Sequence, residues 1–283
     1  MASLRLRERL GALTLALGAA CAVACGTGAS ASDAGRSTSI EFRAEINREP
    51  FVCGQTYANV GIASSDFTVT DARLYVYDIE LVDLSEQTHP LMLDANAYQS
   101  RGLALLDFEN GCGPDGTPGT HTVVTGVAPE LDYQAVRFTL GVPKARNFID
   151  LAHAAPPLDV TGMYWVWQSG YRFLKLDGAS PIAGGGIEPF SVHVGASGCP
   201  GKNLASPPEG DCLYPNTVTY DLPAFSPTHS SITVDIGDLL ADSDLGGPSG
   251  GGCLSSPTDP DCVVVFPRIG IGAPEQQRMF RVE

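Results

Sequence analysis

Short stretches of alternating apolar and polar residues dominate the chain after residue 38. In "SIEFRAEI" (39–46) and "DARLYVYDIELVDL" (71–84), apolar side chains recur at every second position, as in a strand with one buried face. Further stretches of this kind occupy 136–142, 163–177, 188–195, 216–225, 230–240 and 262–271. Gly, Pro, Asn or Asp bounds each stretch, and no long segment sustains a helical period. The pattern predicts an all-β fold, with a single antiparallel β-sandwich or barrel-like domain over 39–283.

The first 38 residues follow a different pattern. Three arginines precede an apolar run that is too short for a membrane-spanning helix. Residues 1–24 are therefore predicted to be a secretory signal peptide. Cys25 follows the small residues "AVA", which makes it a candidate lipid anchor of a lipoprotein, with a soluble secreted protein as the alternative. Residues 25–38 are expected to be a flexible tether, and the protein is expected to be exported, either periplasmic or membrane-anchored.

The composition narrows the classes of partner. The 32 acidic residues outnumber the 17 basic ones, which gives a formal charge of −15. Removal of residues 1–24 would make the protein more acidic, because that segment holds three Arg and one Glu. Such a surface repels phosphates, so nucleic acid is not an expected partner. The acidic surface is typical of a solvated exported protein.

Six cysteines remain beyond the leader, and an even number in an exported chain predicts three disulfides. They are Cys53, Cys112, Cys199, Cys212, Cys253 and Cys262. The short spans 199–212 and 253–262 favour two local pairs, which leaves Cys53 to pair with Cys112. No C-x-x-C pair is present, so metal binding by these cysteines is the weaker interpretation. The Pro-, Gly- and Ser-rich segments between them are predicted to form long, disulfide-stapled loops.

The stretch "MYWVWQSGYRF" (163–173) contains the two tryptophans of the chain. On a strand, Met163, Trp165 and Trp167 project from the same face. Bulky residues on both faces predict a central strand covered on each side. On these grounds alone, core packing is the ordinary explanation of the aromatic pair.

His193 differs in its setting from the other histidines. In "PFSVHVG" it faces away from the apolar side chains of Phe190, Val192 and Val194, so a half-exposed imidazole is expected. The other four lie in polar, turn-like segments: His89, His121, His153 and His229.

Enzymatic motifs do not emerge from the sequence. It contains no zinc-protease motif, phosphate-binding loop, dinucleotide fingerprint or EF-hand spacing. A hydrolase would need a nucleophile and a base that no motif supplies. The sequence therefore favours a protein that is not an enzyme. One alternative is a disulfide-stapled adhesion or carbohydrate-binding module with structural tryptophans.

Several blocks of the sequence closely resemble one protein family. They occur in the order "LALLDFENG", "FTLGVP", "PPLDVTGMYWVWQSGYRFLKLDG", "FSVHVGASGC", "CLYPNTVTYDL" and "GCLSS". Together they resemble the MbnP family, also called the metallo-mystery pair four-Cys motif proteins. The likeness covers most of residues 39–280, and its W-x-W-Q-x-G-Y and H-x-G-x-x-x-C blocks are specific.

The resemblance implies a function. MbnP-like proteins are exported bacterial proteins that bind one copper ion, favouring Cu(I), and act in copper homeostasis. Their partner is a di-haem protein of the MbnH type, from the cytochrome c peroxidase and MauG superfamily. This partner oxidises the first tryptophan of W-x-W to kynurenine, which here is Trp165. His193, Met163 and the kynurenine at Trp165 are then the expected ligands of Cu(I). The residues expected to support them are Trp167, Gln168 and Tyr171.

The chain departs from the family pattern at two positions. Phe148 follows Asn147 where the pattern has histidine, and Leu254 stands where it has methionine. His153 is a candidate to compensate for the first change. Both departures bear on the copper ligands and leave the residues around Trp165 intact.

Overall fold

The computed structural model describes residues 35–182, 184–247 and 251–283. The predicted signal peptide, Cys25 and most of the predicted tether lie outside these residues. Strand β1 (Arg36–Ile46) begins inside the segment assigned to the tether, three residues before the predicted start of the domain. Residues 36–38 are strand because they pair with residues 126–128 of β9 (Val123–Ala128) in the first sheet.

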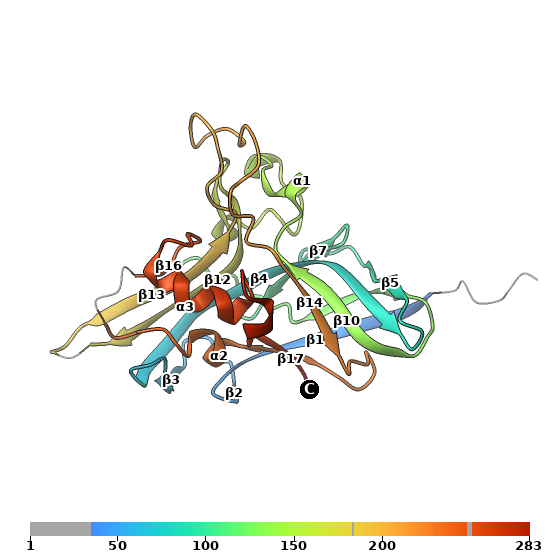
Figure 1. The fold of residues 1–283 in the computed structure, drawn as a ribbon, viewed down its shortest axis with the longest axis horizontal. Helices are drawn as coiled ribbons and strands as arrows, with labels where there is room; N and C mark the ends of the chain where they lie inside the picture. The colour runs from blue at the N-terminus through green and yellow to red at the C-terminus, as the bar shows by residue number, and fades with distance from the viewer. Residues whose placement is uncertain (1–34, 183, 248–250) are drawn as a thin grey trace, which may run out of the picture. The chain divides into compact units, whose positions relative to one another are not determined.

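Two β-sheets form the body of the protein, which confirms the predicted β-sandwich (Figure 1). The first sheet has the order β17 (Phe280–Val282), β15 (Ile232–Asp235), β1, β9 (Val123–Ala128) and β6 (Met92–Leu93), with β2 (Glu49–Pro50) beside β1. The second has the order β14 (Val218–Pro223), β10 (Tyr133–Leu140), β4 (Ser65–Asp83), β12 (Gly170–Pro181), β13 (Ile187–Gly195) and β16 (Gly252–Cys253). Shorter strands join it: β3 (Thr56–Val60), β5 (Thr88–Pro90), β7 (Gln99–Ser100), β8 (Leu103–Asp107) and β11 (Tyr164–Val166).

Most strand pairs are antiparallel, as expected, but two are parallel. Strand β1 runs parallel to β15, and β13 runs parallel to the short β16. In both cases a long connection separates the paired strands in sequence, as a parallel pair requires.

Aromatic side chains from both sheets meet in the core. Phe138 of β10 lies 5.7 Å from Phe42 and 5.1 Å from Phe280 between ring centroids, and both partners belong to the first sheet. Tyr220 of β14 lies 5.3 Å from the same Phe138 ring. All four are buried. Period-two alternation therefore places one face of each sheet in this shared core.

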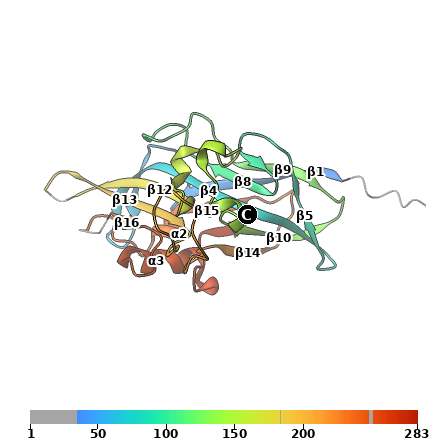
Figure 2. The same ribbon diagram turned by 90° about the horizontal axis from the view of Figure 1, so that it is seen from above.

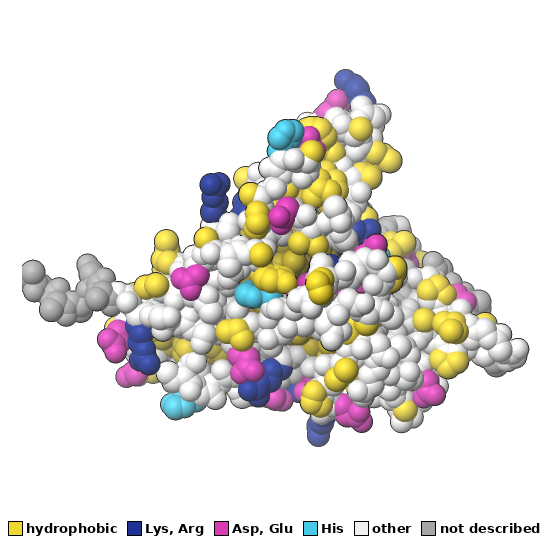
Figure 3. Space-filling model, turned by 180° about the vertical axis from the view of Figure 1, so that it is seen from behind, with side chains coloured by type: hydrophobic (Ala, Val, Ile, Leu, Met, Phe, Trp, Pro, Cys, Tyr) yellow, Lys and Arg dark blue, Asp and Glu magenta, His cyan; other side chains and the backbone are white. Residues whose placement is uncertain are grey.

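A second apolar cluster covers the opposite face of the second sheet. It includes Tyr75, Leu105, Tyr171, Phe173 and Met163, all buried. The segments that cover it rise together above the sandwich and contain α1 (Lys144–Asn147), η1 (Leu151–His153) and η2 (Thr161–Met163) (Figures 1 and 2). Figure 3 shows hydrophobic side chains gathered on this projection, with charged side chains at its tip.

The predicted strand at 262–271 is wrong: this segment is the helix α3 (Pro260–Ile269). Three consecutive valines favoured a strand, but the ends specify a helix. Asp259 caps it through the Asp261 N–H, and Gly270 ends it in the left-handed conformation, with φ +99°. The buried side chains follow helical spacing: Cys262, Val265, Phe266 and Ile269.

Two shorter helical segments lie in the C-terminal part of the chain, one directly after β15 and one between α3 and β17. The predicted strand 230–240 splits into β15 and the helix α2 (Ile236–Leu240), whose cap is Asp235. A 3₁₀-helix, η3 (Pro274–Gln276), precedes β17. Among the described residues, no helix has both the length and the apolar character to cross a bilayer.

Three disulfides join the six cysteines in the pairs favoured by their spacing. They are Cys53–Cys112, Cys199–Cys212 and Cys253–Cys262. The last pair links β16 to α3, and the second closes a loop of the projection. The first ties the segment after β2 to the loop after β8. Each bridge thus restrains a long connection of the kind that the sequence predicted.

Replacement of Phe138 by Ala tests the shared core. Phe138 contacts aromatic rings from both sheets, so its loss should lower the free energy of unfolding by about 3–5 kcal/mol. Chemical denaturation with the disulfides intact measures this change. The control is Leu84→Ala, at a side chain that is 66% exposed, where a change within about 0.5 kcal/mol is expected. Equal changes in the two variants would contradict a shared core centred on Phe138.

Candidate functional site

The W-x-W segment forms a hairpin and not one continuous strand. Strand β11 pairs with the start of β12, with Tyr164 opposite Tyr171 and Val166 opposite Gly170. Gly170 adopts φ +72°, and a Cβ there would lie 2.4 Å from a backbone oxygen, so the turn requires glycine. The chain therefore reverses direction between β11 and β12, which brings Trp165 back over the sheet.

Trp165 is half-buried against β12 and β13. A Cβ on Gly195 would lie 2.7 Å from the indole Cζ3 and 2.5 Å from the Tyr171 carbonyl oxygen, so the ring lies against bare backbone. The Arg172 guanidinium carbon lies 5.2 Å from the indole centroid, within cation–π range. The His193 ring centroid lies 6.5 Å from that of Trp165. The indole is thus held between glycine, guanidinium and imidazole, outside the main core.

His193 lies on the polar face of β13, as the alternation predicted. Phe190, Val192 and Val194 point into the core, but the His193 side chain is only 14% exposed and not half-exposed as expected, because Trp165 and Asp177 lie beside it. Its Nε2 lies 2.7 Å from Asp177 Oδ1 on the neighbouring strand β12. The carboxylate thus occupies Nε2 and leaves Nδ1 as the ring nitrogen for another partner.

Asp177, whose side chain is 26% exposed, contacts a network of buried charges. Burial alone would raise its pKa, but the hydrogen bonds from His193 and Ser191 and the charge of Lys175 outweigh it and hold the pKa below the usual range of aspartate. Lys175 Nζ lies 3.4 Å from Asp177 Oδ2 and donates to Asp71 Oδ2 at 2.7 Å. Arg73 donates two hydrogen bonds to the same Asp71 carboxylate, from Nε to Oδ1 at 2.8 Å and from Nη2 to Oδ2. Because Asp71, Arg73 and Lys175 are buried, each charge needs its partners.

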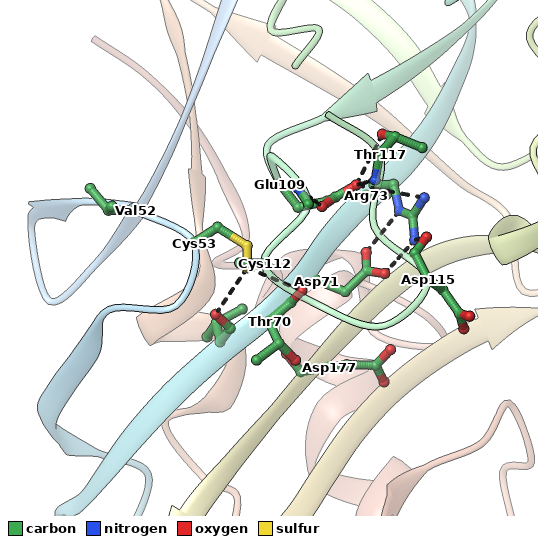
Figure 4. The surroundings of a disulfide bond; sticks show 12 residues. Val52, Cys53, Thr70, Asp71, Arg73, Glu109, Cys112, Asp115, Thr117 and Asp177 are labelled. Carbon is green, nitrogen blue, oxygen red and sulfur yellow. Dashed lines mark hydrogen bonds and ion pairs between the residues drawn. A yellow bond between two sulfur atoms is a disulfide. The ribbon is translucent and has the colours of Figure 1, made fainter. Parts of the chain in front are cut away.

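The loop at 108–122 covers this network (Figure 4). Asp115 accepts a hydrogen bond from Arg73 Nη2 through its backbone oxygen, at 3.1 Å. The Glu109 carboxylate lies 3.9 Å from Arg73 Nη1. Cys112 anchors the loop to Cys53, and its sulfur lies 3.3 Å from the Thr70 carbonyl oxygen. The disulfide therefore fixes the loop at 108–122 over the network of buried charges.

An open pocket of ≈530 Å³ lies beside Trp165. Leu204 and Leu254 contribute exposed apolar side chains to its wall, together with Ser255 and the Cys199–Cys212 loop. All its described lining residues are uncharged, in a chain with a formal charge of −15. This face of Trp165 is thus open to a neutral or apolar contact.

The supporting residues are fixed by hydrogen bonds to the projection. Trp167, in the turn after β11, donates its indole N–H to the Phe148 carbonyl oxygen at 2.9 Å. Gln168 donates to the Cys199 carbonyl oxygen at 3.1 Å. Tyr171 is buried in the second cluster, and this burial raises its pKa well above the ordinary value. All three residues hold the hairpin against neighbouring loops.

The predicted common face of Met163, Trp165 and Trp167 is wrong. Met163 lies in η2 before the strand begins, and its side chain is fully buried in the second cluster. Tyr164 packs against that cluster, so Trp165, the next residue in the strand, points the other way. Trp167 has already left the strand. The prediction was wrong because β11 contains only three residues, so Met163 and Trp167 lie outside the strand.

The two departures from the family pattern lie on either side of the hairpin. Phe148 packs against the second cluster and holds Trp167 through its backbone. Leu254 lies in the wall of the Trp165 pocket and is 52% exposed. His153 lies in η1, where its 85% exposed side chain pairs with Asp150.

Sequence reasoning missed Asp177, Arg172 and Gly195 as parts of the site. One signal was present: Lys175 and Asp177 are charged residues in a strand expected to be covered on both faces. Such charges must find partners inside the protein. The register between β12 and β13 brings Asp177 to His193. This register is a property of the tertiary structure, and no sequence motif predicts it.

Comparison with known proteins identifies the family. The family model described as MbnP matches residues 35–255. The chain belongs to the MbnP family. The solved structure of MbnP from Methylosinus trichosporium has 28% sequence identity and a TM-score of 0.72, over 88% of this chain and 98% of that chain. No curated protein matches the chain. This MbnP-family member thus shares the whole domain with its relative.

Gly195→Ala tests how Trp165 is seated. The new Cβ would overlap the indole and a backbone oxygen, so the ring should move off β13 and become more exposed. A red-shifted tryptophan emission and faster quenching by acrylamide are expected. Gly210→Ala serves as the control, because a Cβ there meets only ordinary van der Waals contact at 3.4 Å. An unchanged emission in the Gly195 variant would contradict the described packing.

Asp107→Asn tests the buried carboxyl at the end of β8. Burial, opposed by the Thr117 hydrogen bond and the Arg73 charge, raises the pKa of Asp107 to about 7. Its pKa in the unfolded chain is about 3.9, so the folded state holds a proton that the unfolded state loses between these values. This contribution to stability is therefore lost as pH rises from about 4 to about 7.

The Asp107→Asn variant has no carboxyl group to titrate at this position, so it does not lose this stability as pH rises. Relative to wild type, its free energy of unfolding should rise on the order of 1–3 kcal/mol between pH 4.5 and pH 8. Chemical denaturation at the two pH values measures it, with Asp94→Asn at an exposed site as the control. Parallel pH curves for wild type and the Asp107 variant would contradict the assignment.

Proposed function

We propose that this protein is an exported copper-binding protein with one Cu(I) site, and that a di-haem partner of the MbnH type oxidises its Trp165 to kynurenine. The observation that carries the proposal is the pairing of Trp165 with His193 across β11 and β13, beside an open, uncharged pocket. Family membership supports the same role in copper homeostasis.

The donor groups include an imidazole that suits copper. Imidazole is a ligand that Cu(I) accepts, and His193 retains Nδ1 for it. Opening of the Trp165 indole would add an aromatic amine and a ketone beside that imidazole. Within the described ranges, no three His, Cys, Asp or Glu side chains converge on one point, so a site for a hard cation is not favoured. Met163 would have to leave the second cluster to become the third ligand.

The setting of Trp165 also suits attack by a protein oxidant. The indole lies in a pocket wall and is not sealed in the core. In this proposal the chain is the substrate of its partner and not an enzyme. It acts outside the cytoplasm, as a periplasmic protein or as a lipoprotein anchored through Cys25. The alternative, a carbohydrate platform, would have to use the pocket side of the indole, because the Arg172 guanidinium lies 5.2 Å from the ring centroid.

Co-expression with the di-haem partner tests the proposal. Conversion of tryptophan to kynurenine replaces one carbon by one oxygen, so the intact mass should rise by about 4 Da. Trp165→Phe should abolish this gain, and Trp167→Phe should retain it. The modified wild type should carry one copper ion per chain. Absence of both the mass gain and bound copper in the presence of active partner would refute the proposed function.

A further inference from the structure

We infer that Asp177 is a positioning residue that sets the tautomer of His193, so that Nδ1 is the nitrogen offered to copper. The inference rests on the proposed function for its metal, but its first consequence, the tautomer, holds in the metal-free protein. The carboxylate and imidazole come from neighbouring strands, and their contact is not required by the hydrogen bonds between those strands.

The geometry of the pair decides which nitrogen carries the proton. His193 Nε2 lies 2.7 Å from Asp177 Oδ1. An ionised carboxylate only accepts hydrogen bonds, whereas a neutral imidazole has one donor nitrogen and one acceptor nitrogen. The neutral ring must therefore hold its proton on Nε2, and its free lone pair lies on Nδ1. A carboxylate partner on a ligating histidine also makes the ring a better electron donor.

The carboxylate itself is held in place from two sides. Ser191 Oγ donates to the same Oδ1 at 2.6 Å, and Lys175 Nζ lies 3.4 Å from Oδ2. Lys175 is in turn fixed by Asp71, at 2.7 Å, which Arg73 grips with two nitrogens. Asp177 cannot turn away from His193 without leaving the Lys175 charge less compensated in a buried site.

The loop at 108–122 adds further contacts to the residues that hold Asp177 in place. The Asp115 carboxylate lies 3.7 Å from Lys175 Nζ, and its backbone oxygen binds Arg73 (Figure 4). The Cys53–Cys112 disulfide anchors that loop beside Asp71. The disulfide thus holds the loop that contacts Arg73 and Lys175, and Lys175 in turn lies beside Asp177. The orientation of His193 therefore depends on these linked contacts.

The strand register separates this role from an ordinary structural one. Asp177 lies opposite Ser191, and Lys175 lies opposite His193, in the antiparallel pair of β12 and β13. The Asp177–His193 contact is thus a diagonal one between side chains, and the backbone ladder forms without it. A residue with only a structural role would change stability and leave the His193 tautomer as it is.

Asp177→Asn reverses the hydrogen bond while keeping the shape. The Lys175 ammonium favours the amide oxygen at the Oδ2 position, which turns the amide NH₂ toward His193. That NH₂ donates to Nε2, so the imidazole proton moves to Nδ1 and blocks the copper-binding lone pair. The charge-matched control is Asp66→Asn, at an exposed residue of β4.

Two measurements test the inference. Nitrogen-15 NMR of histidine-labelled, metal-free protein should show the Nε2–H tautomer of His193 in wild type and in the Asp66 variant, and the Nδ1–H tautomer in the Asp177 variant. Competition with a Cu(I) chelator, on protein co-expressed with the partner, should show affinity weakened roughly 10- to 100-fold in the Asp177 variant only.

The outcomes are distinct. An Nδ1–H tautomer in wild type overturns the inference, and this measurement needs no variant that folds. Wild-type affinity in a folded Asp177 variant also overturns it. A wild type that binds no Cu(I) defeats the proposed function and the metal half of the inference, while the tautomer result still decides the positioning role.

Discussion

The buried carboxylate of Asp71, held between Arg73 and Lys175, is the constraint around which this side of the molecule is built. Three charges removed from water on one sheet face must compensate one another, because an unpaired charge there would be costly. The covering loop, its disulfide and the acidic residues Asp115 and Asp177 all complete this network. The same requirement places a rigid carboxylate beside His193.

The second sheet has two different faces, and the site lies at a boundary on one of them. Its inner face belongs to the core shared with the first sheet. Its outer face is apolar around Tyr75 and Tyr171 and charged around Asp71 and Lys175. The β11–β12 hairpin sends Tyr164 into the apolar part and Trp165 toward Arg172 and His193. An indole at such a boundary is anchored by packing and still reachable from solvent.

The fold was predictable where local pattern and chemistry agreed. Period-two alternation located β1, β4, β10 and β13, and the short cysteine spans favoured the observed pairs. Prediction failed where local signals competed. The valines before Phe266 have strand propensity, yet the Asp259 cap, the Gly270 terminus and the contact of the apolar face with the core produced a helix. The predicted common face of Met163, Trp165 and Trp167 was wrong because the 3₁₀-helix η2 ends at Met163 and the chain leaves β11 after Val166.

The sequence by itself determined the strand-rich fold, the disulfide framework, the family and the two residues, Trp165 and His193, at the centre of the candidate site. These depend on the order and spacing of residues, which a chain carries before it folds. The tertiary structure decided what surrounds them: the glycine under the indole, the guanidinium beside it and the carboxylate on the imidazole. These contacts depend on the register between β12 and β13 and on the position of a loop. Packing over the whole domain sets both, so no local motif encodes them.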